Sequence, residues 1–597
     1  MCGICGEIRF DNSPPTITAL ATMNAIQASR GPDATGILAF NHFAIGHRRL
    51  KIIDLSEHAQ QPMVDNTLGL GVVFNGCIYN YQELKTKLQQ HGYQFFSTSD
   101  TEVILKAYHH WGPDCVKHFN GMFAFALWER DSGRLILARD RLGIKPLYLA
   151  ELPNGLRFAS TLPALVAAGS IDNTIDTGID PISLHYYMNF HAVVPAPYTI
   201  LKGIRKLPPA TIRIIEPNGH STEHQYWELT FGCSKTEATW SYQDWQERTL
   251  ETLRLAVKRR LVADVSVGVL LSGGVDSSLI VGLLAEAGQH GLNTFSVGFE
   301  AAQGELGDEF AYSDLIAKHF ATEHHKIFVD SKRLLPALAQ CVDAMSEPMV
   351  SHDVIGFYLL SQEVARYVKV VQSGQGADEV FAGYHWYPPL LDTTDPVATY
   401  AKVFCDRDHA EFSQAIHPEL VSAIDHSRDF IAQHFAKPGA EHAVDKALRL
   451  DTTIMLIDDP VKRVDNTTMA HGLEARVPFL DHELIELAAR IPAPFKLAAS
   501  GKGVLKEAAR RVIPSTVIDR PKGYFPVPAL KYLQGAYLDF VHDILDSTEA
   551  RQRLLFQRPY IEKLYIEPST HITPLQGSKL WQLAVLEYWL QRHHIPA

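Results

Sequence analysis

The chain has 597 residues, and its 67 acidic side chains outnumber the 55 lysines and arginines, which leaves a net charge of −12. The clustered cationic side chains that bind nucleic acids or anionic membranes are therefore not expected. A hydrophobic share of 46% and a charged share of 20% are typical of a folded globular protein. No apolar run approaches the ~20 residues of a membrane-spanning helix.

The first residues and the cysteines indicate the cellular compartment. Met1–Gly6 is followed at once by the charges of Glu7 and Arg9, so the pattern lacks the basic and apolar regions of a signal peptide, and we expect a cytoplasmic protein. The seven cysteines are scattered and odd in number, which predicts free thiols rather than a disulfide framework. A cysteine with a function is then expected to be catalytic.

Residues 1–218 alternate short apolar runs with turn residues and predict a strand-rich, layered α+β domain. Strands are expected over residues 68–78, 121–128, 134–138 and 156–159. Helices are expected over residues 17–29, 80–91 and 101–111, the last with Asp100 as its N-cap. The polar stretch 219–239 has no periodicity and is predicted to be a linker.

Residues 240–597 follow a different pattern. Ser241 and Asp244 fit a capping box that starts a helix. Strand, turn, helix and strand then alternate in the order expected of a doubly wound parallel α/β sheet. The expected elements are strands 265–271, 293–297 and 368–372 and helices 279–287 and 357–367, followed by added helices to the end of the chain.

The segment from Leu270 to Ser278 reads LLSGGVDSS and lies where a parallel strand leads into a helix. Paired glycines, free helix N–H groups and serine hydroxyls together suit a pyrophosphate group. The lysine of a P-loop is absent, and Asp276 offers instead a carboxylate for a Mg²⁺ ion. The alternative is an ordinary strand-to-helix turn without a ligand.

This segment resembles the signature of the ATP pyrophosphatase superfamily, whose members adenylate a substrate with ATP. The later segment 372–379, QSGQGADE, is similar to the one that completes the site in that family. The resemblance implies a second Mg²⁺-facing carboxylate at Asp378, although Asp378 and Glu379 alone would also fit a helix cap. It implies ATP contacts at Leu271, Ser272, Gly273, Gly274, Asp276, Ser277, Ser278, Val297, Ser373 and Gly374.

Cys2 is the candidate nucleophile of the first domain. Removal of Met1 would give this cysteine a free α-amine that serves as general base for its own thiol. A zinc knuckle or a redox pair with Cys5 are the alternatives. Neither fits well, because no second cysteine pair has zinc-site spacing and no strand precedes the motif.

Further motifs carry a family resemblance: residues 1–4 (MCGI), 30–33 (RGPD), 47–50 (HRRL), 74–80 (FNGCIYN), 99–102 (SDTE) and 139–148 (RDRLGIKPLY). They resemble a class II glutamine amidotransferase domain, which implies the αββα sandwich of N-terminal-nucleophile hydrolases. With the second domain, which implies an ATP-pyrophosphatase-type sheet, the chain resembles the glutamine-hydrolysing asparagine synthetase family. That resemblance implies an ATP-dependent amide ligase.

The same resemblance assigns roles in glutamine hydrolysis. Cys2 attacks the carboxamide, and Asn75 and the Gly76 N–H hold the oxyanion. Arg49 pairs with the α-carboxylate of glutamine and Asp100 with its ammonium group. Ile53 and Cys77 complete the glutamine-binding set, although the family usually has Glu in place of Cys77, which we expect to be a small packed residue.

The acceptor is expected to differ from aspartate. Family members that make asparagine carry Glu where this chain has Gln375, and a neutral amide cannot act as a base. Residues 191–197, 346–353 and 372–387 resemble the N-acetylglutaminylglutamine amidotransferase branch, which implies an osmoprotectant dipeptide amide as product. Asparagine synthetase proper is the alternative, ahead of a lactam synthetase and of a catalytically silent relative. The acceptor-site candidates are Gln375, Asp378 and Glu379.

The resemblance also implies that Lys522 stabilises charge on the phosphates and that an apolar passage carries ammonia between the domains. The expected partners are L-glutamine, ATP, Mg²⁺ at Asp276 and Asp378, a small carboxylate acceptor and a second copy of the chain in a homodimer.

The 28 histidines include adjacent pairs but no His-Glu-x-x-His motif, so we expect them to be packed or solvated rather than metal ligands.

Overall fold

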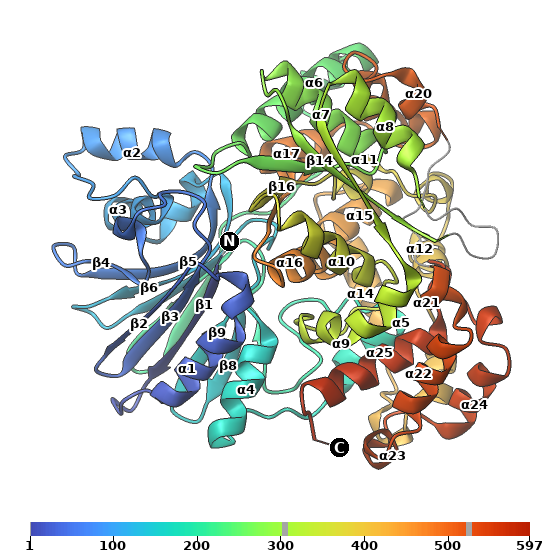
Figure 1. Cartoon of the computed structure of the whole chain (residues 1–597), viewed down its shortest axis with the longest axis horizontal. Helices are drawn as coiled ribbons and strands as arrows, with labels where there is room; N and C mark the ends of the chain where they lie inside the picture. Colours follow the sequence, from blue (N-terminus) through green and yellow to red (C-terminus); the bar gives the residue numbers. More distant parts are fainter. Residues whose placement is uncertain (1, 301–307, 521–527, 597) are drawn as a thin grey trace.

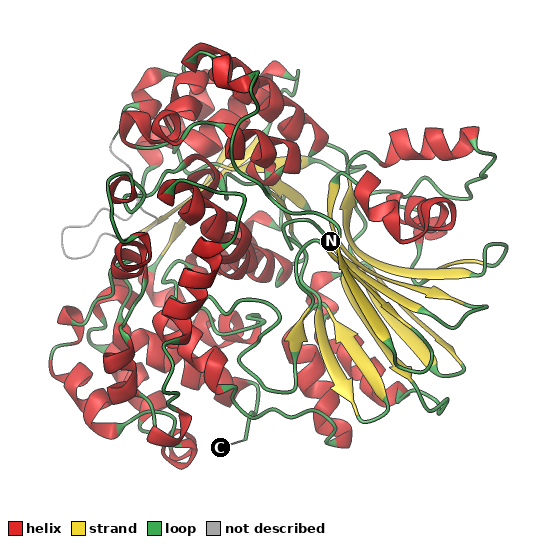
Figure 2. Ribbon diagram, turned by 180° about the vertical axis from the view of Figure 1, so that it is seen from behind, coloured by secondary structure: helices red, strands yellow, loops and turns green. Residues whose placement is uncertain are grey.

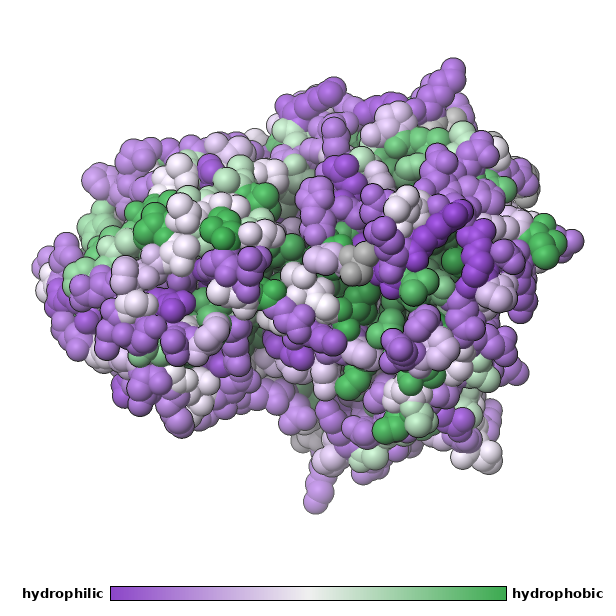
Figure 3. Space-filling view, turned by 90° about the horizontal axis from the view of Figure 1, so that it is seen from below, coloured by the Kyte–Doolittle hydropathy of each residue, from purple (hydrophilic) through white to green (hydrophobic). Residues whose placement is uncertain are grey.

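The computed structural model describes residues 2–300, 308–520 and 528–596. Antiparallel sheets form one side of the molecule, and a parallel sheet with many helices forms the other (Figures 1 and 2). No described helix is both long and apolar enough to cross a bilayer. On the face drawn in Figure 3, apolar residues form small groups among hydrophilic ones.

The first domain is built on two six-stranded antiparallel sheets. One has the order β10-β8-β9-β1-β3-β2, with strands β1 Gly3–Arg9, β2 Ala34–Phe40, β3 Phe43–Arg49, β8 Tyr148–Leu152, β9 Gly155–Ala159 and β10 Arg205–Lys206. The other has the order β12-β11-β7-β6-β5-β4, with strands β4 Met63–Asp65, β5 Leu70–Ile78, β6 Gly121–Glu129, β7 Leu135–Arg139, β11 Thr211–Ile215 and β12 Ser221–Gln225. The strands expected from the sequence are confirmed.

Alternation along the strands explains the layers of this domain. In β5, Val73 belongs to the core between the sheets, whereas Val72 and Phe74 face the outer core that also holds residues of α2 and α3. Helices cover the outer faces of both sheets: α1 Ile17–Ile26, α2 Tyr81–Gln90, α3 Asp100–Trp111 and α4 Leu162–Asp172. The αββα sandwich is therefore confirmed.

Two local expectations for this domain need correction. Strand β12 pairs with β11 and extends the sheet past residue 218, into the stretch expected to be a linker. Asp100 is the first residue of α3 rather than its cap, because the Ser99 side chain accepts the Thr101 N–H and Ser99 has extended backbone angles. The Asp100 side chain is thereby left for another role.

The second domain contains a five-stranded parallel sheet of order β15-β14-β13-β16-β17. Its strands are β13 Val267–Leu270, β14 Asn293–Phe299, β15 Glu323–Val329, β16 Val370–Gln372 and β17 Glu474–Arg476. The chain moves outward from β13 in one direction and then returns to its other side through β16. Ligands bind at the carboxyl ends of strands at such a switch point.

Helices surround the parallel sheet, packing on it or on one another. They are α6 Tyr242–Arg259, α7 Val275–Glu286, α8 Phe310–His319, α9 Leu334–Asp343, α10 Val354–Val364, α11 Ala377–Phe381, α16 Lys462–Met469, α17 His482–Arg490, α18 Ala493–Leu497, α19 Gly503–Ala509 and α20 Ser515–Ile518. The capping box of Ser241 and Asp244 is confirmed at the start of α6. Helix α7 begins at Val275, four residues earlier than expected, because Gly274 already provides its extended N-cap.

The added helices form a large apolar cluster beside the parallel sheet, at the lower right of Figure 1. They are α5 Pro181–Asn189, α12 Pro396–Phe404, α13 His409–Ala415, α14 His426–Ala436, α15 Ala443–Leu450, α21 Pro528–Tyr532, α22 Ala536–Leu545, α23 Thr548–Arg553, α24 Arg558–Ile566 and α25 Lys579–Arg592. Helix α5 comes from the end of the first domain and packs among them, so the two domains share this core.

Candidate active sites

The first pocket surrounds Cys2 at the start of β1. Side chains from β3, β5, α3 and β17 converge on it. Its lining includes Cys2, Arg49, Leu50, Ile52, Ile53, Ala59, Gln61, Phe74, Gly76, Cys77, Ser99, Asp100, Thr101, Glu474 and Arg476. Most of the glutamine-binding residues expected from the sequence are thereby brought together. Asn75 joins them through its contact with Cys2.

Asn75 and Cys2 have the geometry expected of a nucleophile and an oxyanion donor. The Cys2 N–H donates to Asn75 Oδ1 at 3.0 Å, which orients the amide. The buried Nδ2 of Asn75 has no acceptor among the described residues, so it is available to a ligand oxygen. A Cβ atom at Gly76 would collide with the Met122 carbonyl oxygen, so only glycine fits this part of β5. Burial raises the pKa of the Cys2 thiol.

Arg49 holds the loop beside the pocket. Its guanidinium donates to the Ser56 carbonyl at 2.9 Å and also to the Asp54 carbonyl, while the side chain is almost fully buried. Two of its donors are thus used to shape the wall that contains Ile53. A guanidinium has five N–H donors, so further donors remain for a ligand carboxylate.

Asp100 and Cys77 lie at the same wall of the pocket. Asp100 accepts the Ile78 N–H at 3.1 Å, and burial raises the pKa of its carboxyl to about 6. Cys77 is fully buried, and burial raises the pKa of its thiol far above the ordinary value. Unlike Cys2 after removal of Met1, Cys77 has no α-amine of its own to accept the thiol proton, which favours a packing role for Cys77.

Sequence reasoning missed two residues of this pocket, Glu474 and Arg476. Both belong to β17 of the second domain and form a buried ion pair of 2.6 Å. Burial would raise the pKa of Glu474, but neighbouring cationic groups, including Arg476, lower it to about 2. They lie on an edge strand of the parallel sheet, and a single sequence does not show that this strand reaches the other domain's pocket.

A buried ion triad connects Cys2 to the second domain. Arg30 donates to the Cys2 carbonyl at 3.2 Å and pairs with Asp465 at 2.9 Å, and Lys145 pairs with Asp465 at 3.2 Å. Arg30 and Lys145 belong to the motifs at residues 30–33 and 139–148, and Asp465 lies on α16. Removing one member of such a triad would leave a buried charge without compensation.

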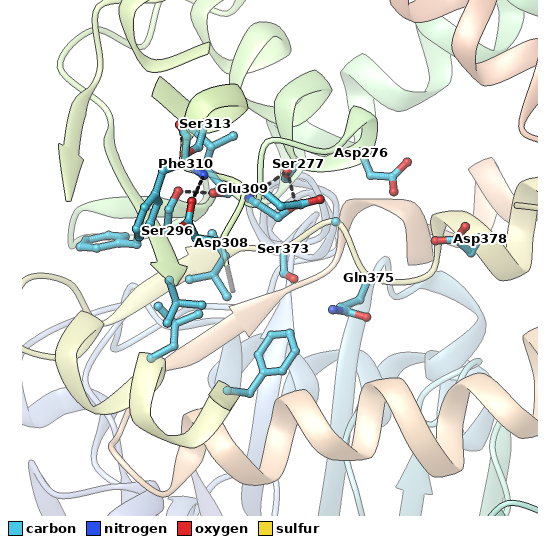
Figure 4. A pocket seen from close by; sticks show the side chains of 18 of the residues that line it. Asp276, Ser277, Ser296, Asp308, Glu309, Phe310, Ser313, Ser373, Gln375 and Asp378 are labelled. Atoms are coloured by element: carbon cyan, nitrogen blue, oxygen red, sulfur yellow. Dashed lines mark hydrogen bonds between the residues drawn. The ribbon is translucent and has the colours of Figure 1, made fainter. Parts of the chain in front are cut away.

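The second pocket lies at the carboxyl ends of β13, β14 and β16 and has a cavity volume of about 180 Å³. Figure 4 shows Asp276, Gln375 and Asp378 toward one end and Ser296, Asp308 and Phe310 toward the other, with Ser373 between them. Of the residues predicted from the sequence, the lining contains Leu271, Ser272, Asp276, Ser277, Val297, Ser373, Gly374, Gln375, Asp378 and Glu379.

The SGG segment forms a tight turn before α7. The Ser277 Oγ accepts the Ser272 N–H at 3.2 Å, and Gly273 has a φ of +75°, which favours glycine. Gly273 and Gly274 shape this turn but are not among the lining residues. Ser278 is fully buried and also lies outside the lining, because consecutive helical side chains point about 100° apart.

Asp276 and Asp378 are connected by a lysine. Lys502 Nζ lies 2.7 Å from Asp276 Oδ2 and 3.0 Å from Asp378 Oδ2. Burial would lower the pKa of Lys502, but the two carboxylates outweigh it and raise that pKa. The predicted pair of carboxylates is thus close enough to share one cation, and carboxylate oxygens are the ligands that Mg²⁺ prefers.

Sequence reasoning did not identify Lys502. It lies between Gly501 and Gly503, at the N-cap of α19, with a φ of +57°. A lysine between two glycines was the one available signal, but a loop lysine is usually solvated. Lys522, which the resemblance implied, lies outside the described residues.

Glu379 has a different environment from Asp378. Tyr384 donates to Glu379 Oε1 at 2.7 Å, and both side chains line the pocket. Burial and the neighbouring Asp378 raise the pKa of Glu379 to about 7. Gln375 is half-buried beside these groups and carries no charge. The pocket therefore offers a carboxyl group that changes protonation near neutral pH.

Comparison with known proteins agrees with this two-site architecture. The asparagine synthase family model matches residues 248–591, and the glutamine amidotransferase domain model matches residues 1–227. The chain is 29% identical to asparagine synthetase (glutamine-hydrolyzing) 1 of Bacillus subtilis (strain 168), over 100% of this chain and 98% of that protein. It is 28% identical to asparagine synthetase (glutamine-hydrolyzing) 3 of the same organism, over 100% of this chain and 99% of that protein.

Among solved structures, glutamine phosphoribosylpyrophosphate amidotransferase from B. subtilis matches 57% of this chain and 93% of its own, with 14% identity and a TM-score of 0.30. The two family models define the class, a glutamine amidotransferase domain joined to a synthase domain. The chain belongs to the asparagine synthase family and is an ATP-dependent, glutamine-hydrolysing ligase.

Proposed function

We propose that this enzyme converts the C-terminal carboxylate of N-acetylglutaminylglutamine into an amide, with ammonia from glutamine and energy from ATP. The neutral Gln375 in the pocket that holds Asp276 and Asp378 is the observation that carries this choice of acceptor. The resemblance of the chain to the N-acetylglutaminylglutamine branch at residues 191–197 and 346–353 supports the same choice of acceptor. The product would be an osmoprotectant dipeptide amide.

In the first half-reaction, the Cys2 thiolate attacks the carboxamide of glutamine after its proton passes to its own α-amine, once Met1 has been removed. Asn75 Nδ2 and the Gly76 N–H stabilise the oxyanion, and ammonia leaves as the thioester forms. Water then hydrolyses the thioester to glutamate. Arg49 binds the α-carboxylate and Asp100 the α-ammonium group of the substrate.

In the second half-reaction, the acceptor carboxylate attacks the α-phosphorus of ATP and pyrophosphate leaves. Ammonia then displaces AMP from the acyl adenylate. Ser272, Ser277 and the N-terminus of α7 are suited to binding the phosphates. Asp276 and Asp378 would hold Mg²⁺, which neutralises phosphate charge when bound. Lys502 stays beside the phosphates as a second source of positive charge.

Asparagine synthesis is the alternative function, and the names of the two B. subtilis relatives favour it. In that case aspartate would occupy the end of the pocket near Gln375 and Glu379. The titration of Glu379 near pH 7 would then supply the base that Gln375 cannot.

The test is ATP-dependent pyrophosphate release with glutamine present, with L-aspartate and N-acetylglutaminylglutamine compared as acceptors at equal concentrations. Mass spectrometry identifies the product, which is about one mass unit lighter than the acceptor when a hydroxyl becomes an amide. Release with the dipeptide alone supports the proposal. Release with aspartate alone rejects it and leaves asparagine synthesis. A Gln375→Glu variant that gains activity with aspartate would identify Gln375 as a determinant of the acceptor.

A further inference from the structure

A second cluster of potential ligands lies outside both pockets, among the added helices. His185 is on α5, His409 is the first residue of α13, and Asp425 is the N-cap of α14. Their ligand atoms all lie within 4.8 Å of one another. His185 is fully buried, whereas His409 and Asp425 are partly exposed. The cluster thus has one buried ligand and two that a metal ion reaches from solvent.

The two distances from His185 to the other ligand atoms are close to those in a small coordination sphere. His185 Nε2 lies 3.1 Å from His409 Nδ1 and 3.7 Å from Asp425 Oδ1. Two imidazoles bound to one Zn²⁺ at about 2.0–2.1 Å in tetrahedral geometry have nitrogens about 3.3–3.4 Å apart. Two imidazoles and one carboxylate are a donor set that suits Zn²⁺ and related transition metals.

The surroundings of His185 orient it as a ligand. Its Nδ1 lies 3.0 Å from Ser427 Oγ; in the tautomer that carries its proton on Nδ1, the hydroxyl oxygen accepts this hydrogen bond and the Nε2 lone pair faces the cluster. Metal-bound histidines are commonly held in this way by a hydrogen bond at the other nitrogen.

Asn189 supplies an independent observation. It is 1% exposed, its Nδ2 lies 3.2 Å from His185 Nε2, and its Oδ1 has no hydrogen-bond partner among the described residues. A half-turn of the amide brings Oδ1 to the side of the cluster, since the two amide positions are nearly equivalent in shape. The orphaned oxygen would then serve as a fourth ligand.

We propose that His185, His409 and Asp425, with Asn189 or water in the fourth position, bind one Zn²⁺ ion. The ion would connect α5, within the span matched by the amidotransferase model, to α13 and α14, within the span matched by the synthase model. Because its ligands lie in neither pocket, the ion would stabilise the arrangement of the two domains and take no part in the chemistry.

The experiment uses the full chain without a histidine tag, stripped with EDTA and dialysed. Zn²⁺ is titrated by calorimetry, and Co²⁺ is added separately to record visible absorption. We expect one Zn²⁺ per chain, the intense bands of tetrahedral Co²⁺ and a higher Tm with Zn²⁺. The His409→Ala and Asp425→Ser variants should each bind Zn²⁺ at least 10-fold more weakly, and serine keeps the N-cap of α14.

His426→Ala is the matched control, because His426 is next to Asp425 but its Nε2 bonds Ser422 Oγ at 3.0 Å. It should bind Zn²⁺ as the unmodified chain does. Equal Zn²⁺ affinity in His409→Ala and the unmodified chain would overturn the proposal, as would the lack of tetrahedral Co²⁺ bands. In that case the short contact of His185 with His409 would be a hydrogen bond alone.

Discussion

The two pockets differ in how the chain builds them. Among the described residues, those that line the ATP-type pocket all come from the stretch 270–384, within one domain. The pocket around Cys2 is lined by both domains, since Glu474 and Arg476 reach it from β17. The second pocket also has the larger cavity, about 180 Å³ against about 30 Å³.

This difference indicates that the pocket around Cys2 depends on the second domain, whereas the ATP-type pocket does not depend on the first. The glutamine pocket is complete only when the synthase domain is docked, and the triad of Arg30, Lys145 and Asp465 fixes that docking next to Cys2. The ATP-type pocket has no such requirement among its lining residues. Ammonia released without a synthase domain would be wasted, and this construction would couple glutamine hydrolysis to the presence of the acceptor site.

The largest expected effect is that of Cys2→Ala, which should impair the reaction of one pocket and leave that of the other intact. Cys2→Ala should lower glutamine hydrolysis by at least about 1,000-fold, because the nucleophile is lost. The rate of pyrophosphate release with added ammonium chloride should stay within about twofold of the rate of the unmodified enzyme, since no atom of the second pocket changes. A parallel loss of the ammonia-driven reaction would show that the pockets are not independent.

Asn75→Ala should lower kcat for glutamine hydrolysis by about 100- to 1,000-fold, since one oxyanion donor is removed. KM for glutamine should change little if the donor acts mainly in the transition state. Steady-state assay of glutamate formation measures both constants. A change confined to KM would contradict the oxyanion role.

Asp378→Asn tests the opposite pocket. It removes one of the two carboxylates that share Lys502, and we expect a loss of about 100-fold in pyrophosphate release with either glutamine or ammonia. Glutamine hydrolysis without acceptor should stay close to normal. If Mg²⁺ bound elsewhere, the dependence of the rate on Mg²⁺ concentration would be unaltered in this variant.

Glu474→Gln tests the dependence of the first pocket on the second domain. Glu474 lines the same pocket as Cys77 and Asp100, and we expect its carboxylate to replace the Glu that the family usually has at position 77. Its loss should therefore raise KM for glutamine about 10-fold. Ammonia-driven synthesis should be unaffected. Glu483→Gln is the matched control, because Glu483 pairs with Arg259 on the same domain and does not line the pocket.

The smallest effect concerns pH. Burial raises the pKa of Asp100 to about 6, so the carboxylate is charged above this pH and gains a proton as the pH falls through it. The attraction to the glutamine ammonium group is then lost, and kcat/KM for glutamine should fall several-fold between about pH 7 and pH 5. Asp100→Asn should lack this inflection, while ammonia-driven synthesis should not show it in either protein.

Particular residues show how far the sequence alone could lead. The SGG segment and Asp378 each come directly after a strand of a parallel sheet, so the sequence predicts that they lie at the same edge of that sheet. The order of the strands does not predict the positions of Lys502 and Glu474. Each comes from a distant part of the chain and has no local motif, and only packing brings Lys502 to Asp276 and Glu474 to the pocket of Cys2.

Local sequence was enough to predict two domains, the αββα and parallel sheets, and Cys2, Asn75, Asp276 and Asp378 as candidate site residues. Periodicity, turn residues and short motifs carry that information, because they act over a few residues. Which domain completes each pocket, and which histidines meet, depends on how the chain packs. Such contacts join residues up to 435 positions apart, as in Arg30 and Asp465, and depend on the docking of whole domains.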